Sequence, residues 1–166
     1  IAAKSLRGPL LSNVADFQQF DRSTLTYDTL PDAAHMRHVG YLTVGASKPK
    51  VVRSQAASKS SFLLRFGRYY NTNYALITSG ETTEVLTGTV PPSDSQDTLT
   101  LKRLALLPTA QGADYAGFSP GENRFAYVQK GAQLVTYDLE LLQPATLLFT
   151  AAPTRAVDWV DGYHVA

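Results

Sequence analysis

The stretch GFSPGENRFAYVQKGAQLVTYDLE, from Gly117 to Glu140, contains the clearest structural pattern in the chain. A tight turn at 119–123 is built from Ser, Pro, Gly, Glu and Asn, and Ser, Pro, Gly and Asn are residues that β-turns favour. Strand-forming residues follow at 124–128, a glycine turn lies at 131, and apolar and polar residues then alternate over 133–139. The stretch therefore predicts a meander of short antiparallel strands joined by tight turns.

The same order of features recurs along the chain: an apolar run with a bulky aromatic residue, a turn, and a strand that carries tyrosine. The aromatic residues are Phe17, Phe66, Phe118 and Trp159, which stand 49, 52 and 41 residues apart. Propeller blades repeat at about 40–50 residues, and a lone meander cannot bury both of its faces. We therefore expect residues 1–166 to form one all-β domain of antiparallel four-stranded meanders. The repeat predicts a partial β-propeller with about three blades and the start of a fourth.

The unit from Phe118 to Leu139 resembles a blade of the TolB-type β-propeller family. Blades of that family carry a phrase close to F-S-P-D-G-x-x-I-A-Y, followed by an L-x-V-x-D-L strand. Here the phrase is FSPGENRFAY, with Gly121-Glu122-Asn123 where the family usually has Asp-Gly-Lys, and QLVTYDL follows. Since a closed propeller needs about 4–8 blades, we expect a fragment of a longer chain or completion by a second copy. A β-sandwich without a true repeat is the alternative fold.

Composition excludes several classes of protein. The chain has 166 residues, of which 44% are hydrophobic and 17% charged, so it can bury a core and is not a disordered segment. A net charge of +1 argues against a nucleic-acid partner. The absence of cysteine excludes disulfides, thiolate catalysis and zinc–cysteine sites. No apolar run is long enough to predict a membrane-spanning helix.

Two short motifs are found in enzymes, but their surroundings argue against catalysis. Residues 117–121 match G-x-S-x-G, the nucleophile elbow of α/β-hydrolases, which needs a helix after the serine. A strand pattern follows here, so we interpret Ser119 as a turn residue. Residues 47–50 match S-x-x-K, which needs a helical turn, and Pro49 lies within it.

Asp32, His35 and His38 form the densest polar cluster of the chain and are its candidate metal ligands. Two histidines at i and i+3 on a helix can share a metal ion with a carboxylate. No fourth ligand is apparent nearby, and the segment is typical of a loop that enters a strand. We therefore expect no metal ion, no other cofactor and no catalytic set. For the carboxylate of Asp138, we expect hydrogen bonds from nearby backbone N–H groups.

A repeated scaffold without a catalytic set is typical of a binding module. We expect a non-enzymatic scaffold in a bacterial extracytoplasmic protein, which contacts a protein partner or a second copy through loops 29–38 and 88–98 at one rim. The resemblance also allows the propeller portion of a hydrolase or peptidase whose catalytic domain lies outside this chain. A carbohydrate-binding β-sandwich using Tyr69, Tyr70 or Trp159 is a further alternative.

Overall fold

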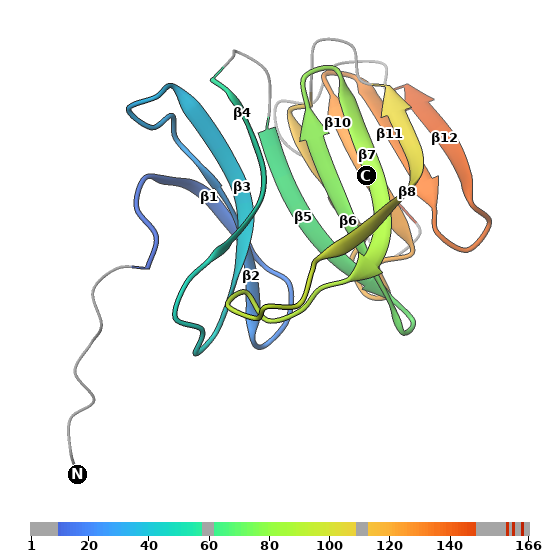
Figure 1. Cartoon of the computed structure of the whole chain (residues 1–166). Coiled ribbons are helices and arrows are strands. Elements are labelled where there is room, and N and C mark those ends of the chain that lie inside the picture. The colour runs from blue at the N-terminus through green and yellow to red at the C-terminus, as the bar shows by residue number, and fades with distance from the viewer. Residues whose placement is uncertain are drawn as a thin grey trace.

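The computed structural model describes residues 10–57, 62–108, 113–148, 159, 161 and 164 of the chain. The regular secondary structure of these residues consists of twelve β-strands. The strands are β1 (Val14–Gln19), β2 (Thr24–Thr29), β3 (Met36–Thr43), β4 (Lys50–Ala56), β5 (Phe62–Tyr69), β6 (Thr72–Ser79), β7 (Thr82–Thr89), β8 (Thr100–Pro108), β9 (Tyr115–Phe118), β10 (Phe125–Lys130), β11 (Gln133–Asp138) and β12 (Gln143–Leu148). They form three antiparallel four-stranded sheets (Figure 1).

Each sheet is a meander in which neighbouring strands follow one another in the chain. Sheet 1 contains β1 to β4, sheet 2 contains β5 to β8, and sheet 3 contains β9 to β12. The predicted class, all-β with antiparallel four-stranded meanders, is confirmed. Since the chain reverses at every turn, successive turns alternate between the two ends of a sheet. We call the end that carries the β1–β2, β3–β4, β5–β6 and β7–β8 connections the first-turn end (Figure 1).

Glycines set two of the hairpins at the opposite end. In β6–β7 the pair Ser79 and Thr82 closes a two-residue turn, and its first residue, Gly80, has a φ of 62°. The β10–β11 hairpin is built in the same way, with Gly131 at a φ of 53°. A positive φ matches the twist of two-residue hairpins and is unstrained for glycine. The turn chemistry in the sequence therefore places these hairpins correctly.

Two hydrophobic cores hold the three sheets together, and sheet 2 contributes to both. The core between sheets 1 and 2 contains Val39, Tyr41, Phe62, Leu64, Phe66, Ala75, Ile77 and Leu86. The core between sheets 2 and 3 includes Tyr74, Leu76, Val85, Leu107, Ala126, Val128, Val135, Tyr137 and Leu139. Successive side chains of a strand point to opposite faces. The apolar run at 74–77 therefore supplies two side chains to each core, and a strand buried on both faces needs such a run.

Two of the repeat aromatics occupy matching positions in sheets 2 and 3. Phe66 of β5 pairs across to Ala75, and Phe118 of β9 pairs across to Ala126. Each ring packs toward the sheet that precedes it. The ring of Phe66 lies 5.5 Å from that of Tyr41, between centroids, and Phe118 lies over Gly67. A Cβ on Gly67 would meet the Phe118 ring at 2.6 Å, so glycine allows this close approach.

The other two repeat aromatics lie at the ends of the stack. Phe17 of β1 is 68% exposed, on the face of sheet 1 that points away from sheet 2. Trp159 stacks on Phe125 at 6.2 Å and contacts Tyr127 at 5.4 Å, measured between ring centroids. Trp159 thus covers part of the face of sheet 3 that points away from sheet 2.

Candidate partner-binding cleft

Loop 90–99, between β7 and β8, is the best candidate for a binding element. Its sequence begins Val-Pro-Pro, and proline has no backbone N–H with which to continue a strand ladder. The loop crosses from sheet 2 to the β3–β4 turn of sheet 1 at the first-turn end (Figure 1). The segment that the sequence predicts as an exposed loop therefore joins two sheets.

Backbone and side-chain hydrogen bonds attach the start of the loop to sheet 1. Ser93 is buried, and it donates from its N–H to Thr43 Oγ1 at 3.0 Å and accepts from the Thr43 N–H at 3.1 Å. The Ser93 hydroxyl donates to the Lys48 carbonyl at 2.8 Å. The Tyr41 hydroxyl donates to the Pro91 carbonyl at 2.9 Å. Burial raises the pKa of Tyr41 to about 12, so this donor keeps its proton at neutral pH.

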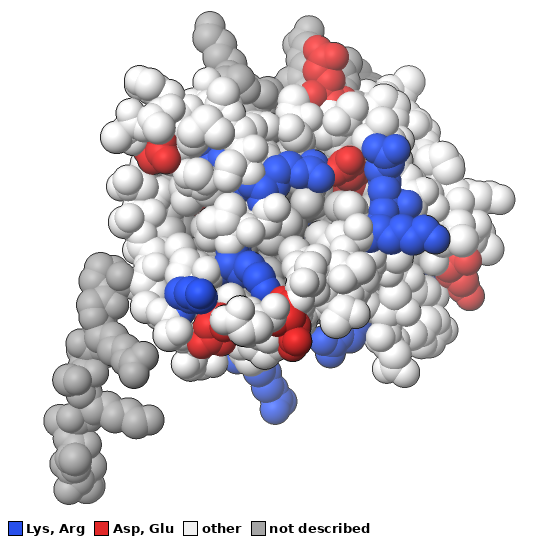
Figure 2. All heavy atoms as spheres, in the orientation of Figure 1, with Lys and Arg blue, Asp and Glu red and all other residues white. Residues whose placement is uncertain are grey.

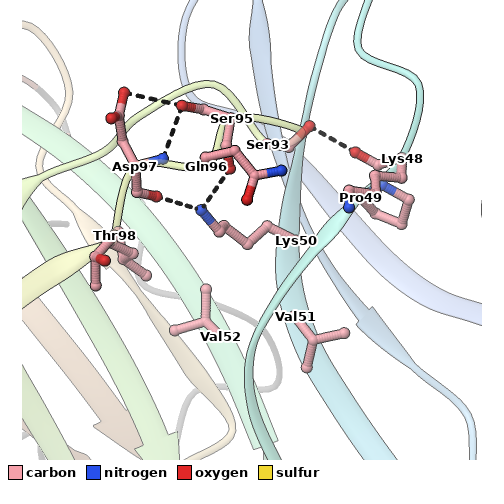
Figure 3. Close-up of a pocket in the computed structure, with 11 residues that line it drawn as sticks. Lys48, Pro49, Lys50, Val51, Val52, Ser93, Ser95, Gln96, Asp97 and Thr98 are labelled. Carbon is pink, nitrogen blue, oxygen red and sulfur yellow. Dashed lines mark hydrogen bonds between the residues drawn. The ribbon is translucent and has the colours of Figure 1, made fainter.

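Charged side chains attach the rest of the loop. The Asp94 carboxylate accepts a hydrogen bond from the Ser47 N–H at 2.8 Å. The Lys50 ammonium donates to the backbone carbonyl of Asp97 at 2.7 Å and to that of Ser95 at 3.4 Å (Figure 3). These contacts join residues more than 40 positions apart, so the loop is held in one place relative to β4.

A cleft of about 570 Å³ lies between this loop and β4 (Figure 3). Val51, Val52 and Leu99 provide its apolar surface. Hydroxyl, amide and carboxylate groups from 93–98 form the facing wall, and Lys48 and Lys50 lie on the β4 side. The volume is within the range of sites for small ligands. A cleft with an apolar floor and polar walls suits a short peptide segment.

The two strands beside the cleft are the last strands of their sheets and carry basic residues. Edge strands have backbone N–H and C=O groups with no partner in their own sheet. β4 carries Lys50 and Arg53, and β8 carries Lys102 and Arg103. Arg53 and Arg103 both contact Glu84, at 2.6 and 3.5 Å, so one carboxylate serves two guanidinium groups. Figure 2 shows several separate groups of Lys and Arg side chains on the face drawn, with Asp and Glu side chains between them.

The pKa of Asp94 provides a test of the loop attachment. The Ser47 N–H holds this pKa below its usual value of 3.8. A lowered folded-state pKa means that the contact stabilises the fold at pH values above 3.8 and is lost as the pH falls through the folded pKa. We expect the hydrogen-exchange protection factor of the Ser47 amide to fall severalfold in Asp94→Ala, and to fall in the unmodified protein as it is acidified below pH 4.

Asp97→Ala is the matched control for this prediction, because the Asp97 carboxylate bonds within the loop, to Ser95. Ser47 should stay protected in this variant. If both alanine variants expose the Ser47 amide equally, or neither does, Asp94 does not anchor the loop.

Asp32 and His35 lie at the opposite end, in the β2–β3 connection, and His38 lies near the start of β3. Asp32 accepts from the Met36 N–H at 2.9 Å through one carboxylate oxygen and contacts His38 Nε2 at 3.1 Å through the other. The second ring nitrogen of His38 lies 2.8 Å from the Ser54 hydroxyl. His35 is exposed in the turn with a φ of 55°. In the residues the structure describes, no three His, Asp or Glu side chains are placed to hold a metal ion.

The two loops expected to share one rim lie at opposite ends of the sheets. Loop 29–38 is the second connection of its meander, and loop 88–98 overlaps the third connection of the next one. Successive connections of a meander fall at opposite ends, so the second connection of sheet 1 and the third connection of sheet 2 do not share a rim, and one flat partner cannot contact both. The shared-rim expectation is wrong for this reason, and the cleft belongs to loop 90–99 alone.

The remaining candidates have structural roles. Ser119 is fully buried, its hydroxyl accepts from the Phe125 N–H at 3.2 Å, and a strand follows it, so it is a turn residue as predicted. Asp138 accepts hydrogen bonds from two backbone N–H groups of the following turn at 2.8 and 3.1 Å, which confirms the expected bonding to nearby backbone.

The tyrosines of the carbohydrate-binding alternative differ in exposure: Tyr69 is buried in the core, whereas Tyr70 is exposed beside it. A sugar-stacking platform would rest on Tyr70 alone at this turn.

Sequence reasoning singled out the loop but missed the residues that hold it, Tyr41, Thr43 and Lys50. Their partners lie 45–50 positions away, and no local pattern indicates such contacts.

Among the described residues, we find no helix long and apolar enough to cross a membrane. Comparison of the chain with protein-family models, curated proteins and solved structures found no significant match. The case for this cleft therefore rests on its geometry.

Proposed function

We propose that the chain is a non-enzymatic, propeller-like scaffold that binds a protein partner in the cleft beside loop 90–99. The partner segment is extended and acidic. The observation that carries this proposal is a cleft with fixed walls between the edge strand β4 and the loop that leads into the edge strand β8, and both of these strands carry basic residues. The proposal includes the placement of the scaffold in a bacterial extracytoplasmic protein, which rests on the resemblance to TolB-type blades.

The packing of the sheets supports a propeller over a β-sandwich. In a sandwich, two sheets share one core and each keeps an outer face toward solvent. Here sheet 2 is buried on both faces, and Phe66 and Phe118 point from the first strands of sheets 2 and 3 toward the preceding sheet. Radial repetition produces such a series, because each new blade covers its predecessor with the same face.

The edges of the cleft support an extended partner. A peptide can add to an exposed edge strand through main-chain hydrogen bonds, while side-chain pockets supply specificity. Val51 is 52% exposed at the cleft and can receive an apolar side chain. The side chains of Lys102 and Arg103 are exposed nearby, and they favour carboxylates on the partner.

Peptide display against the immobilised chain tests this function. We expect enrichment of acidic sequences without proline, whose affinity falls as salt is raised. The double substitution Lys102→Glu with Arg103→Glu should weaken binding by about tenfold or more. Arg22→Glu, in the exposed β1–β2 turn and outside the residues that line the cleft, is the control for a general change in charge and should leave binding intact. Enrichment of non-acidic peptides, or equal loss in both variants, would refute the cleft as the site.

A further inference from the structure

The register of the β3–β4 ladder shows which main-chain groups of β4 point to its free edge. The Ala57 N–H donates to the His35 carbonyl at 2.7 Å, so these residues form a hydrogen-bonded pair of the antiparallel ladder. Hydrogen-bonded and non-hydrogen-bonded pairs alternate along such a ladder. Ser54 and Ala56 therefore belong to non-hydrogen-bonded pairs. Their N–H and C=O groups point away from β3, toward the edge.

Hydrogen bonds on the other side of β3 agree with this assignment. Met36, which pairs with Ala56, donates its N–H at 2.9 Å to a carboxylate of the β2–β3 loop. His38, which pairs with Ser54, donates its N–H at 2.9 Å to a side-chain hydroxyl of β2. Both residues thus point their N–H groups away from β4. Among the described residues, the main-chain groups of Ser54 and Ala56 have no hydrogen-bond partner outside sheet 1.

A β-bulge separates this edge from the cleft. Arg53 pairs with Val39 and Val51 pairs with Gly40, so Val52 is an extra residue in β4. A bulge disrupts the ladder locally and bends the strand. The regular edge of β4 therefore ends at Arg53, and the cleft floor of Val51 and Val52 follows directly. A segment that pairs with the edge can continue into the cleft.

A cationic site lies beside the same edge, between β4 and β8. The side chain of Arg53 points toward sheet 2, since its partner Val39 lies in the core between sheets 1 and 2. Arg53 and Arg103 contact the carboxylate of Glu84, and their side chains are 38% and 60% exposed. Two guanidinium groups and one carboxylate leave one positive charge in excess. An added carboxylate would balance this charge with charge-assisted hydrogen bonds.

We propose that the partner segment adds to β4 as a fifth strand of sheet 1, with main-chain hydrogen bonds to Ser54 and Ala56 and an acidic side chain at every second position. The proposal rests on the function proposed above and specifies the sequence pattern of the partner. Side chains of paired residues share a face, and Arg53 and Gln55 contact sheet 2. Partner residues level with these two therefore also face sheet 2, on the side of Arg103. Carboxylates are favoured at these alternate positions and not at those between them.

Hydrogen exchange of the full chain, followed by NMR, tests the strand addition. The probe is a short peptide that alternates glutamate with threonine, a residue that favours strands. When the peptide is bound, the amides of Ser54 and Ala56 should exchange about tenfold more slowly or less. The amides of Gln55 and Ala57 already bond to β3 and are the internal control, so their exchange should change little. If Ser54 and Ala56 are not protected while the peptide is bound, the strand addition is refuted and the cleft proposal stands.

A second peptide tests the alternation of acidic residues. It has the same composition and charge, but all its glutamates precede its threonines. It should bind about tenfold more weakly, because fewer of its carboxylates face sheet 2. Equal affinities of the two peptides would overturn the alternating pattern. If neither peptide binds and display enriches no acidic sequence, the proposed function fails together with this inference.

A variant of β4 tests the contribution of its edge. Ala56→Pro removes an N–H that points outward, and edge strands tolerate proline at such positions. Binding of the alternating peptide should weaken about tenfold or more. Ala56→Ser keeps the N–H and is the matched control, which should bind like the unmodified chain. Urea unfolding shows whether Ala56→Pro is folded, and the exchange experiment does not depend on this variant. Equal binding by the two folded variants would contradict the strand addition.

Discussion

Replacing Phe66 with alanine is expected to lower the free energy of unfolding by about 3–5 kcal/mol. Phe66 is 5% exposed and lies in the core that joins sheets 1 and 2, with its ring 5.5 Å from those of Phe20 and Tyr41. Alanine removes the ring contacts and leaves a cavity between two sheets that are held by other residues and cannot fully close it. Urea unfolding at pH 7 measures the loss.

Phe17→Ala is the matched control, because Phe17 is the same residue type on the first strand of the preceding sheet. At 68% exposure its ring buries little apolar area, so the change should cost less than about 1 kcal/mol. Equal losses in the two variants would contradict the account of Phe66 as the contact that joins sheets 1 and 2.

Replacing Arg65 with methionine is expected to lower the free energy of unfolding by about 3–5 kcal/mol. Arg65 lies on β5, is 8% exposed, and contacts Asp16 at 2.5 Å and Asp28 at 3.6 Å. The Asp28 side chain is only 3% exposed, and its second cation, Arg37, lies at 3.9 Å. Methionine keeps most of the volume but leaves a buried carboxylate with too little positive charge. The change therefore tests the electrostatic role of Arg65 more than its packing.

The pH dependence of this variant separates the two roles. Burial raises the pKa of Asp28, and the positive charge of Arg65 opposes that rise. Without Arg65 the folded-state pKa rises further above the usual value of 3.8, so the folded state binds a proton that the unfolded state does not. Stability then falls as the pH rises through this window and recovers as the pH is lowered. We expect part of the loss in Arg65→Met to disappear as the pH is lowered from 7 toward 4.

The double substitution Arg65→Met with Asp28→Asn provides the control, because it removes the charge that lost its partner. It should be more stable than Arg65→Met at pH 7, and urea unfolding across this pH range measures both effects. A loss in Arg65→Met that does not change with pH, and that Asp28→Asn does not relieve, would assign Arg65 a packing role only.

Local sequence patterns account for most of the strands and turns. The turn glycines Gly80 and Gly131 place two hairpins, and the prolines at 91 and 92 place the loop between β7 and β8. The predicted strand at 74–78 is observed as β6, at Thr72–Ser79. These features depend on residues near one another in the chain, where backbone conformation and side-chain alternation act directly.

The candidate site could be predicted only in part. The sequence marks 90–98 as a loop, but it does not show that Ser93 bonds to Thr43 or that Lys50 bonds to the backbone of Asp97. It also does not show that the expected contact loops point to opposite ends. That result follows from counting the turns of each meander, which requires knowing where every strand begins and ends.

The sequence by itself determined that this protein consists of antiparallel meanders, because alternation and turn residues act over a few positions. The tertiary structure decided which repeated aromatic residues are buried. Phe17 and Phe66 have the same side chain on the first strands of neighbouring sheets, yet one is 68% and the other 5% exposed. The difference arises because burial depends on whether another sheet covers the face, and that is a contact between segments about 50 residues apart rather than a property of either segment.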